Sequence, residues 1–251
     1  MKLLMDPKRM PFVAALPAIA GFVLRRSLYG YALDGKNLLP AYHPLELALW
    51  MITALTALWI VLAARKQEDS GLYEDNFQAS FPAAQGHILL ATGIMLTVAL
   101  NGPAMEGIPG KLWKLSGTLS GPLLIWGGFC RAQGKRPNVL SHGAACVFFV
   151  LHLICHYQTW CSNPQLQDYV FAFFGAMGMM LTAYYLAAFD TGRGDRRMLL
   201  AVGLLTEYLC IVNLANTEYL YLYVTGGIWA AASLCAPIAA DRKAGGADVS
   251  A

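Results

Sequence analysis

The sequence predicts an all-α, polytopic membrane protein, a bundle of about eight transmembrane helices. Three observations lead to this fold class. Hydrophobic residues make up 57% of the 251-residue chain and charged residues only 13%, about half the charged share of ordinary soluble domains. The apolar residues form continuous runs of about 20, the length that crosses a bilayer. Basic residues cluster in every second connection between these runs, which is the pattern of cytoplasmic loops.

Eight stretches have the length and composition of a spanning helix. Breaker residues separate them, for example Asn101-Gly102-Pro103 after the third stretch. The runs are continuous, whereas transmembrane strands would alternate apolar and polar residues, so helices are expected. The stretches are Met10–Leu28, Leu45–Ala64, Pro82–Leu100, Leu112–Arg131, Val139–Trp160, Tyr169–Phe189, Met198–Ala215 and Tyr219–Ile238.

The positions of the basic residues predict the orientation of the chain. They precede the first stretch and follow the second, fourth, sixth and eighth. The positive-inside rule therefore places both termini in the cytoplasm, which agrees with an even number of spans. The residues are Lys2, Lys8, Arg9, Arg65, Lys66, Arg131, Lys135, Arg136, Arg193, Arg196, Arg197, Arg242 and Lys243.

Two parts of the chain are expected on this basis. Residues 1–239 form the transmembrane helical domain, and residues 240–251 form a short cytoplasmic tail. Glycine and polar residues dominate the tail, so we expect it to be disordered.

Composition and missing motifs exclude several functions. A net charge of +3 is too small to indicate nucleic acid as a partner. The six cysteines form no CxxC pair, so no metal site is expected. There is no P-loop and no HExxH or GxSxG motif, and we expect no cofactor. The lipid bilayer is the expected partner, together with a small-molecule ligand, while protein partners stay open.

Glu207 lies near the middle of the seventh stretch. Thr206, Cys210, Asn213 and Thr217 fall on one helical stripe beside it. A carboxylate at this depth must be protonated, paired or hydrated. Two interpretations stay open: a neutral side chain bonded to another helix, or one wall of a water-lined cavity.

The fifth stretch carries His142, His152 and His156. The last two are four residues apart, so both face the same side near the predicted outer end. They could bridge neighbouring helices, take part in proton-linked ligand binding, or ligate a metal or haem.

Arg25 and Arg26 end the first stretch on the predicted outer side, against the positive-inside pattern. They either snorkel to the interface or one turns inward to Glu46 or to an anionic ligand. Together with Glu207 as a floor, the outer polar residues predict a pocket that opens outward. The ligand-binding candidates are Glu207, His152, His156, Asn213, Arg25, Arg26, His43 and Glu46.

Three segments carry a resemblance. At Gly21-Phe22-Val23-Leu24-Arg25-Arg26, at Trp160–Phe171 and at Ala188-Phe189-Asp190, the chain resembles a group of uncharacterised multi-pass membrane proteins of anaerobic Gram-positive bacteria. The resemblance implies a bacterial cytoplasmic membrane and no particular activity.

Three functions follow as hypotheses. The first is binding or transport of a small molecule through the outward-facing pocket. The second is a membrane enzyme with His152 or His156 as general base and Glu207 as acid; the sequence identifies no nucleophile, so its catalytic residues stay unknown. The third is a haem-bearing or quinone-linked anchor subunit, because His87 and His142 lie near the predicted inner side of different stretches.

Overall fold

The computed structural model describes residues 9–31, 43–68, 70–102, 107–161, 166–216 and 218–235, and within these ranges the fold is all-α without strands. Each of the eight predicted stretches coincides with one helix, and a ninth, α3, was not predicted. The predicted tail, residues 240–251, lies outside the described ranges. The helices are α1 (Met10–Tyr31), α2 (Pro44–Arg65), α3 (Tyr73–Asn76), α4 (Phe81–Asn101), α5 (Gly107–Ala132), α6 (Val139–Cys161), α7 (Leu166–Asp190), α8 (Arg196–Asn213) and α9 (Leu220–Cys235).

Five of these helices, α1, α2, α4, α6 and α7, are long and apolar enough to cross a membrane. The fold is therefore that of a multi-pass membrane protein. α9 is apolar but has only 16 residues, and α8 has 18 residues that include two arginines and Glu207. Eight spans and a cytoplasmic location of both termini stay predictions.

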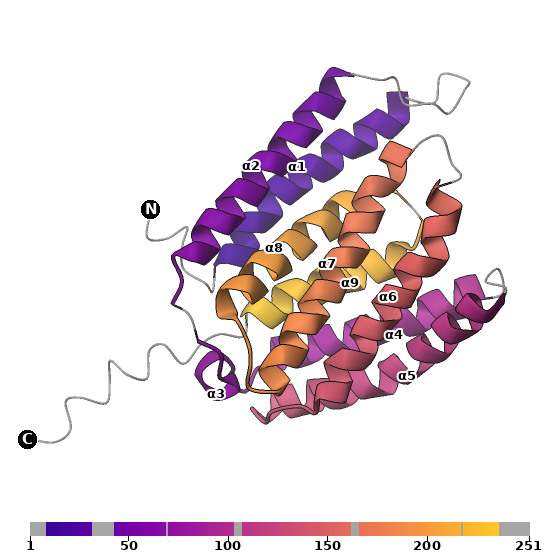
Figure 1. Ribbon diagram of the computed structural model, residues 1–251. Helices are drawn as coiled ribbons and strands as arrows, with labels where there is room; N and C mark the ends of the chain where they lie inside the picture. The colour runs from indigo at the N-terminus through magenta and orange to yellow at the C-terminus, as the bar shows by residue number, and fades with distance from the viewer. Residues whose placement is uncertain are drawn as a thin grey trace, which may run out of the picture.

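Six helices close into a ring. Each helix from α4 to α9 packs against the next one along the chain, and α9 returns to pack against α4. We call this arrangement the six-helix ring. The α1–α2 hairpin packs against α8 and lies at one side of the ring (Figure 1). The interior of the ring is therefore lined by side chains from six helices.

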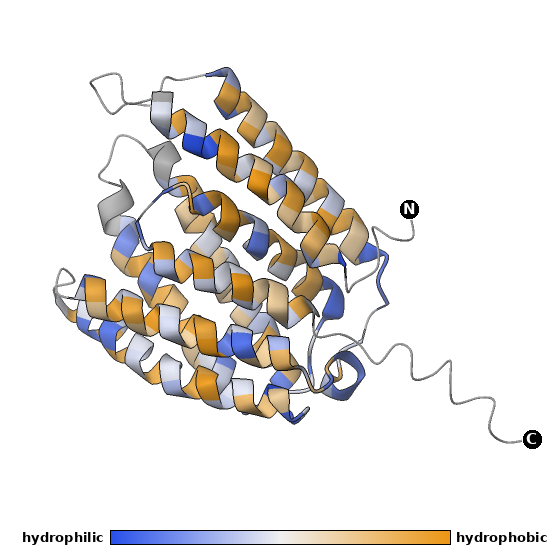
Figure 2. Cartoon of the chain, turned by 180° about the vertical axis from the view of Figure 1, so that it is seen from behind, coloured by the Kyte–Doolittle hydropathy of each residue, from blue (hydrophilic) through white to orange (hydrophobic). Residues whose placement is uncertain are grey.

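Large apolar side chains are exposed on the outside of the bundle, and hydrophobic residues predominate along its helices in the hydropathy colouring (Figure 2). Phe12 on α1 is 71% exposed, Leu55 on α2 66% and Trp126 on α5 61%. Apolar surface of this extent is typical of contact with lipid, because soluble monomers rarely expose large contiguous apolar patches.

Glycines allow the ring helices to approach closely. A Cβ atom on Gly117 would lie 2.5 Å from Val98 Cγ2, and one on Gly121 would lie 2.7 Å from Met95 Sδ. These two glycines form the GxxxG of the fourth predicted stretch, and they pack α5 against α4 within the chain.

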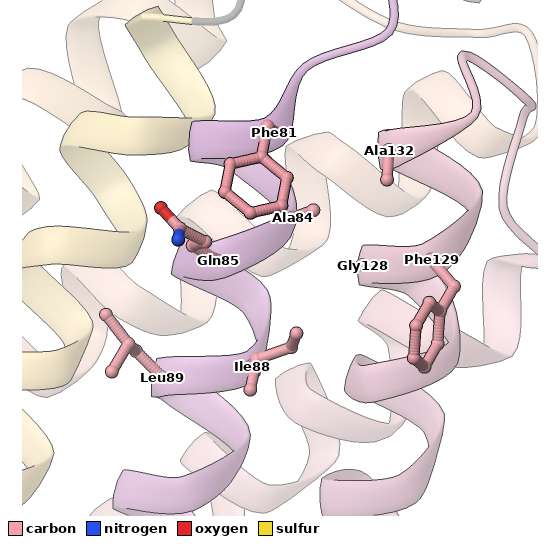
Figure 3. Close-up of a pocket in the computed structure, with 8 residues that line it drawn as sticks. All are labelled: Phe81, Ala84, Gln85, Ile88, Leu89, Gly128, Phe129 and Ala132. Carbon is pink, nitrogen blue, oxygen red and sulfur yellow. The ribbon is translucent and has the colours of Figure 1, made fainter.

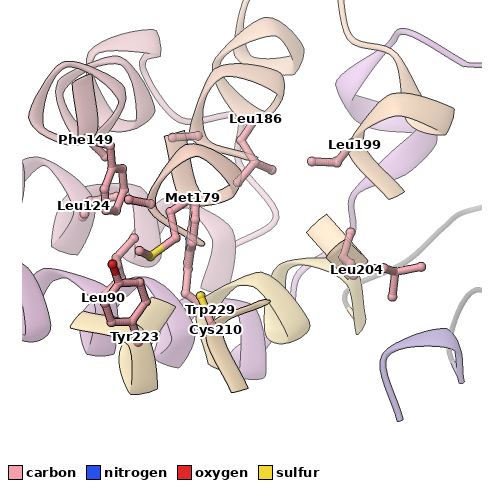
Figure 4. Close-up of a cluster of buried hydrophobic side chains, with 14 of the residues drawn as sticks. Leu90, Leu124, Phe149, Met179, Leu186, Leu199, Leu204, Cys210, Tyr223 and Trp229 are labelled. Atoms are coloured by element: carbon pink, nitrogen blue, oxygen red, sulfur yellow. The ribbon is translucent and has the colours of Figure 1, made fainter. Parts of the chain in front are cut away.

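The interior of the ring is apolar at mid-height. Leu90 of α4, Phe149 of α6, Met179 of α7 and Trp229 of α9 are each fully buried in one cluster (Figure 4). On α4 and α6 this cluster follows a histidine near the start of the helix, and on α6 two more histidines come after it. The apolar core thus separates two polar groups, one toward each end of the ring.

The basic connections after α2, α5 and α7 meet at one end of the bundle. Gly194 N–H donates to Gly71 O at 3.0 Å, and Ser80 N–H donates to Arg131 O at 3.1 Å. Arg197 Nε donates to Gln67 O at 2.8 Å. We call this the basic end, and the other the opposite end. α3 lies at the basic end, in the connection between α2 and α4.

Candidate functional site

A chain of hydrogen bonds joins three ring helices near the basic end. His87 Nε2 of α4 lies 2.8 Å from His142 Nε2 of α6. His142 Nδ1 lies 2.5 Å from Asp190 Oδ2, at the end of α7. The other ring nitrogen of His87, Nδ1, lies 2.7 Å from Ala83 O. We call His87, His142 and Asp190 the proton chain, and their exposed fractions are 0%, 1% and 6%.

Local structure fixes the members of the proton chain. Ser80 caps α4, accepting from Ala83 N–H with its hydroxyl, and His87 bonds back to the carbonyl of Ala83 one turn earlier. The indole of Trp229 packs edge-on against the His87 ring, with centroids 6.2 Å apart. The backbone carbonyl of Asp190 accepts from Arg136 Nε.

Counting hydrogens defines the charge of the proton chain. The bonds from His87 to Ala83 O, from His87 to His142 and from His142 to Asp190 each need one hydrogen. Two neutral imidazoles supply one hydrogen each and a carboxylate supplies none. One further proton is therefore required, and its charge cancels that of the carboxylate. Without steric change, this proton can reside on Asp190, His142 or His87, because each choice satisfies all three bonds.

Arg131, near the end of α5, is 1% exposed, and it is close enough to the proton chain for its charge to act on the His87 ring. Its Nη1 donates to the hydroxyl of Tyr73 at 3.4 Å, and its Cζ lies 3.8 Å from the centroid of the Phe77 ring. That ring in turn packs edge-on against Phe189, the neighbour of Asp190, with centroids 5.0 Å apart. The α3 segment thus covers the guanidinium from the basic end.

The charge of Arg131 has no acidic partner among the described residues. Its Nε and Nη2 are buried without a hydrogen-bond partner, and so is Asp190 Oδ1. Tyr73 does not supply the missing anion, because burial raises the pKa of its phenol above the ordinary value despite the opposing effect of Arg131. Its hydroxyl donates to Lys135 O at 3.1 Å. A buried, unbalanced guanidinium is costly, so this position is arranged for a further anionic group.

A second polar group lies toward the opposite end. His156 Nε2 is 2.5 Å from the Tyr219 hydroxyl, and His156 Nδ1 is 2.7 Å from His152 O. His152 is fully buried, and neither of its ring nitrogens has a hydrogen-bond partner among the described residues. Its ring stacks on Trp113, with centroids 6.1 Å apart. Tyr219 has φ of +54°, a strained conformation for an aromatic residue that positions its hydroxyl against His156.

The predicted outer candidates fall into two groups. Arg25 is 4% exposed and donates from Nη1 to Asn213 Oδ1 at 2.7 Å, so it turns inward instead of snorkelling. Arg26 Nη1 lies 3.5 Å from Ala215 O. These contacts join α1 to the end of α8. On α6, by contrast, His156 bonds to the hydroxyl of Tyr219, just before α9, and the His152 ring packs edge-on against the Tyr219 ring.

His43 and Glu46 lie at the start of α2. His43 is the N-cap residue, and its Nδ1 accepts from Leu45 N–H at 3.3 Å. Glu46 is in the first turn, where an acidic side chain stabilises the helix dipole. A helix-end role accounts for both, and their convergence with the other candidates on one outer pocket stays a prediction.

Glu207 is buried in α8, with 4% of its surface exposed. The predicted stripe beside it is buried too: Thr206, Cys210 and Asn213 are at most 1% exposed, while Thr217 lies outside the described residues. Thr206 bonds to Thr182 of α7 at 3.0 Å. Glu207 Oε2 is buried without a hydrogen-bond partner in the described part of the chain.

A groove of about 500 Å³ runs along the outside of α4 and α5 near the basic end (Figure 3). Phe81, Ile88 and Phe129 are exposed along it, and Gln85 is its one polar side chain. Its lining is apolar apart from Gln85, and none of its residues is an acid or a base.

The sequence identified part of the basic-end site. It placed His87 and His142 at one end, and they do meet. A shared haem iron would hold their nitrogens roughly 4 Å apart, given metal–nitrogen bonds of about 2 Å, whereas a separation of 2.8 Å is a direct hydrogen bond. Asp190 and Arg131 were not among the candidates. The signal for Asp190 was its place in the Ala188-Phe189-Asp190 motif.

No known protein family, curated protein or solved structure matches this chain. The function must therefore be argued from the side chains themselves.

Proposed function

We propose that this protein is a proton-linked transporter of a small solute, with the proton chain as its protonatable element. The observation that carries the proposal is the hydrogen-bonded series His87–His142–Asp190, buried inside the ring. Buried ionisable groups inside a membrane protein are expensive to keep, and they are characteristic of proton relays. Here one proton can be placed on any of three groups that come from three different helices.

The second polar group supports transport over simple binding. His142 and His152 are ten residues apart on α6, which corresponds to about 15 Å along a helix. Between them, Ala145, Phe148 and Phe149 are fully buried and apolar. An apolar layer between two groups of histidines is a barrier to free proton flow. In a coupled transporter, such a barrier makes proton movement depend on the solute.

An enzyme is supported less well. The proton chain has the base-and-orienter arrangement that activates a nucleophile. However, the nearest hydroxyl in sequence, Ser141, donates to Leu123 O at 2.9 Å and not to either histidine. The described residues offer no other hydroxyl or thiol bonded to the proton chain.

The test uses purified protein in proteoliposomes that contain a pH-sensitive dye. Gradients of organic acids, amino acids, sugars and amines are imposed one at a time. We expect at least one solute to enter together with protons, so that the internal pH falls. Asp190→Asn should abolish the pH change, because an amide cannot release a proton.

The control is Asp195→Asn. Asp195 is the N-cap of α8 and accepts from Met198 N–H at 2.9 Å, a role that asparagine fills equally well. It lies five residues from Asp190 and should leave proton movement intact. Solute uptake without any pH change, or an unchanged pH response in Asp190→Asn, would refute proton-linked transport through the proton chain.

A further inference from the structure

We infer that Arg131 binds a small organic monoanion, a carboxylate, at the basic end, and that the anion and one proton are bound together. The inference rests on the proposed function and names its substrate class. It starts from an unpaired, fully buried guanidinium beside the proton chain: Arg131 is 1% exposed, with Nε and Nη2 both unpartnered.

The geometry of Arg131 favours a planar anion. Nε and one Nη form an edge of the guanidinium that a carboxylate can contact with both oxygens. Nη1 is already directed to Tyr73, at 3.4 Å, whereas Nε and Nη2 remain without partners. The Phe77 ring lies 3.8 Å from Cζ, and it provides an apolar surface for the carbon part of such a ligand.

Charge balance couples the anion to the proton. With its proton, the proton chain is neutral, so the positive charge of Arg131 needs an anionic ligand. Without its proton, the proton chain carries one negative charge on Asp190, and the positive charge of Arg131 balances it. The other two states are the protonated proton chain without an anion and the deprotonated proton chain with one. Each leaves a net charge buried in the protein, which is unfavourable. Anion and proton therefore enter and leave the site together.

The other charged groups of this end leave the argument unchanged. None of the acidic groups among them is buried, so none compensates Arg131 from inside the ring, and Arg196 is itself buried with its Nε unpartnered. Tyr73 is neutral, as its burial requires. The charged side chains on the packed elements are Glu74 and Asp75 on α3, Lys135 and Arg136 after α5, and Arg193 and Asp195 after α7, all of them exposed or half-buried, and Arg196 on α8, which interacts with Glu68.

The test measures binding of sodium acetate to the full-length protein in nanodiscs by calorimetry, in buffers of different ionisation enthalpy. On the alkaline side, we expect uptake of about one proton per acetate and a fall in affinity of about tenfold per pH unit. On the acidic side, proton uptake and the pH dependence of the affinity should both vanish, because the proton chain already holds its proton before acetate binds.

Three variants make the test specific. Arg131→Met should lose acetate binding. Lys135→Met, which removes an exposed cation four residues further on, should bind as wild type does. Asp190→Asn should bind acetate without proton uptake and without pH dependence. Should Arg131→Met fail to fold, Arg131→Lys keeps the charge but loses the two-nitrogen edge, and it should bind at least tenfold more weakly.

Acetate binding that survives in Arg131→Met, or wild-type binding without proton uptake at any pH, would overturn the inference. So would the absence of acetate binding at every pH. In these cases proton-linked transport of a different solute still stands if the liposome assay shows it. Conversely, intact co-binding of acetate and a proton without solute-driven pH changes would refute transport and retain the anion site.

Discussion

Replacing Asp190 with asparagine tests the hydrogen count of the proton chain directly. Asparagine can present its amide N–H₂ to His142 Nδ1, where the protonated carboxyl presents its O–H. His142 then donates to His87, and His87 to Ala83 O, so all three bonds described above are kept. Asp190→Asn therefore mimics the protonated chain and should cost less than about 1 kcal/mol of stability.

Asp190→Leu should be more harmful. Leucine has a similar size but leaves His142 Nδ1 buried without a partner, which costs about 1–3 kcal/mol. If Asp190 were instead a permanent carboxylate paired with a permanent imidazolium, asparagine would break a buried ion pair at a cost of about 3–5 kcal/mol. The two accounts thus differ by about 2 kcal/mol or more for the same substitution.

Thermal unfolding of the detergent-solubilised protein separates these accounts. A change of 1 kcal/mol corresponds to about 2–4 °C in the melting temperature for a chain of this size. We expect Asp190→Asn to melt within about 4 °C of wild type and Asp190→Leu to melt lower. Asp195→Asn serves as the control and should be silent. Asparagine melting as low as leucine would show that the proton chain does not share one proton.

Three further substitutions, two of them with a matched control, test the packing, the second polar group and Glu207. Gly127→Ala should cost more than about 1 kcal/mol in thermal unfolding, because its Cβ would overlap the hydroxyl of a serine on α6, whereas Gly143→Ala meets no atom within 4 Å and should be neutral or slightly stabilising. Tyr219→Phe should cost about 1 kcal/mol by removing the hydrogen bond between its hydroxyl and His156 Nε2, and Tyr221→Phe, 53% exposed, should be silent in the same melt. Glu207→Gln should preserve the melting temperature if this side chain is neutral and bonded to a neighbouring helix; loss of solute-driven proton movement with unchanged stability would instead give it a role in transport.

Hydrophobicity was sufficient to predict the helices, because lipid forces each spanning segment to satisfy its own backbone. Each of the eight predicted stretches overlaps one helix, and within the described residues the ends differ by at most five residues. α3 was missed because a four-residue helix has no apolar periodicity. Its position is set instead by tertiary contacts, such as the burial of Tyr73 and Phe77 against Arg131.

The candidate site was harder to predict. Which side chains meet in a helix bundle depends on how each helix is rotated about its axis, and the distance between residues in the sequence does not reveal this. Arg131 follows an apolar run and was interpreted as a basic loop residue, although it is 1% exposed. Asp190 ends its helix, where an acidic residue is unremarkable. Arg25 and Asn213 were both candidates, but the sequence could not show that they meet at 2.7 Å.

The closure of the ring between α4 and α9 has a consequence for biosynthesis. The face of α4 that carries His87 and Gly93 is covered by Trp229 and Thr225 of α9, yet roughly 120 residues separate the two helices along the chain. At a translation rate of about 5–20 residues per second, α4 waits roughly 6–24 s in the membrane for its neighbour. During that interval another contact, such as the insertion machinery or α5, must cover this face of α4 and keep His87 from lipid. Premature termination before α9 would therefore produce a protein whose ring is not closed. The uncovered face of α4 would make it a target for membrane quality-control proteases.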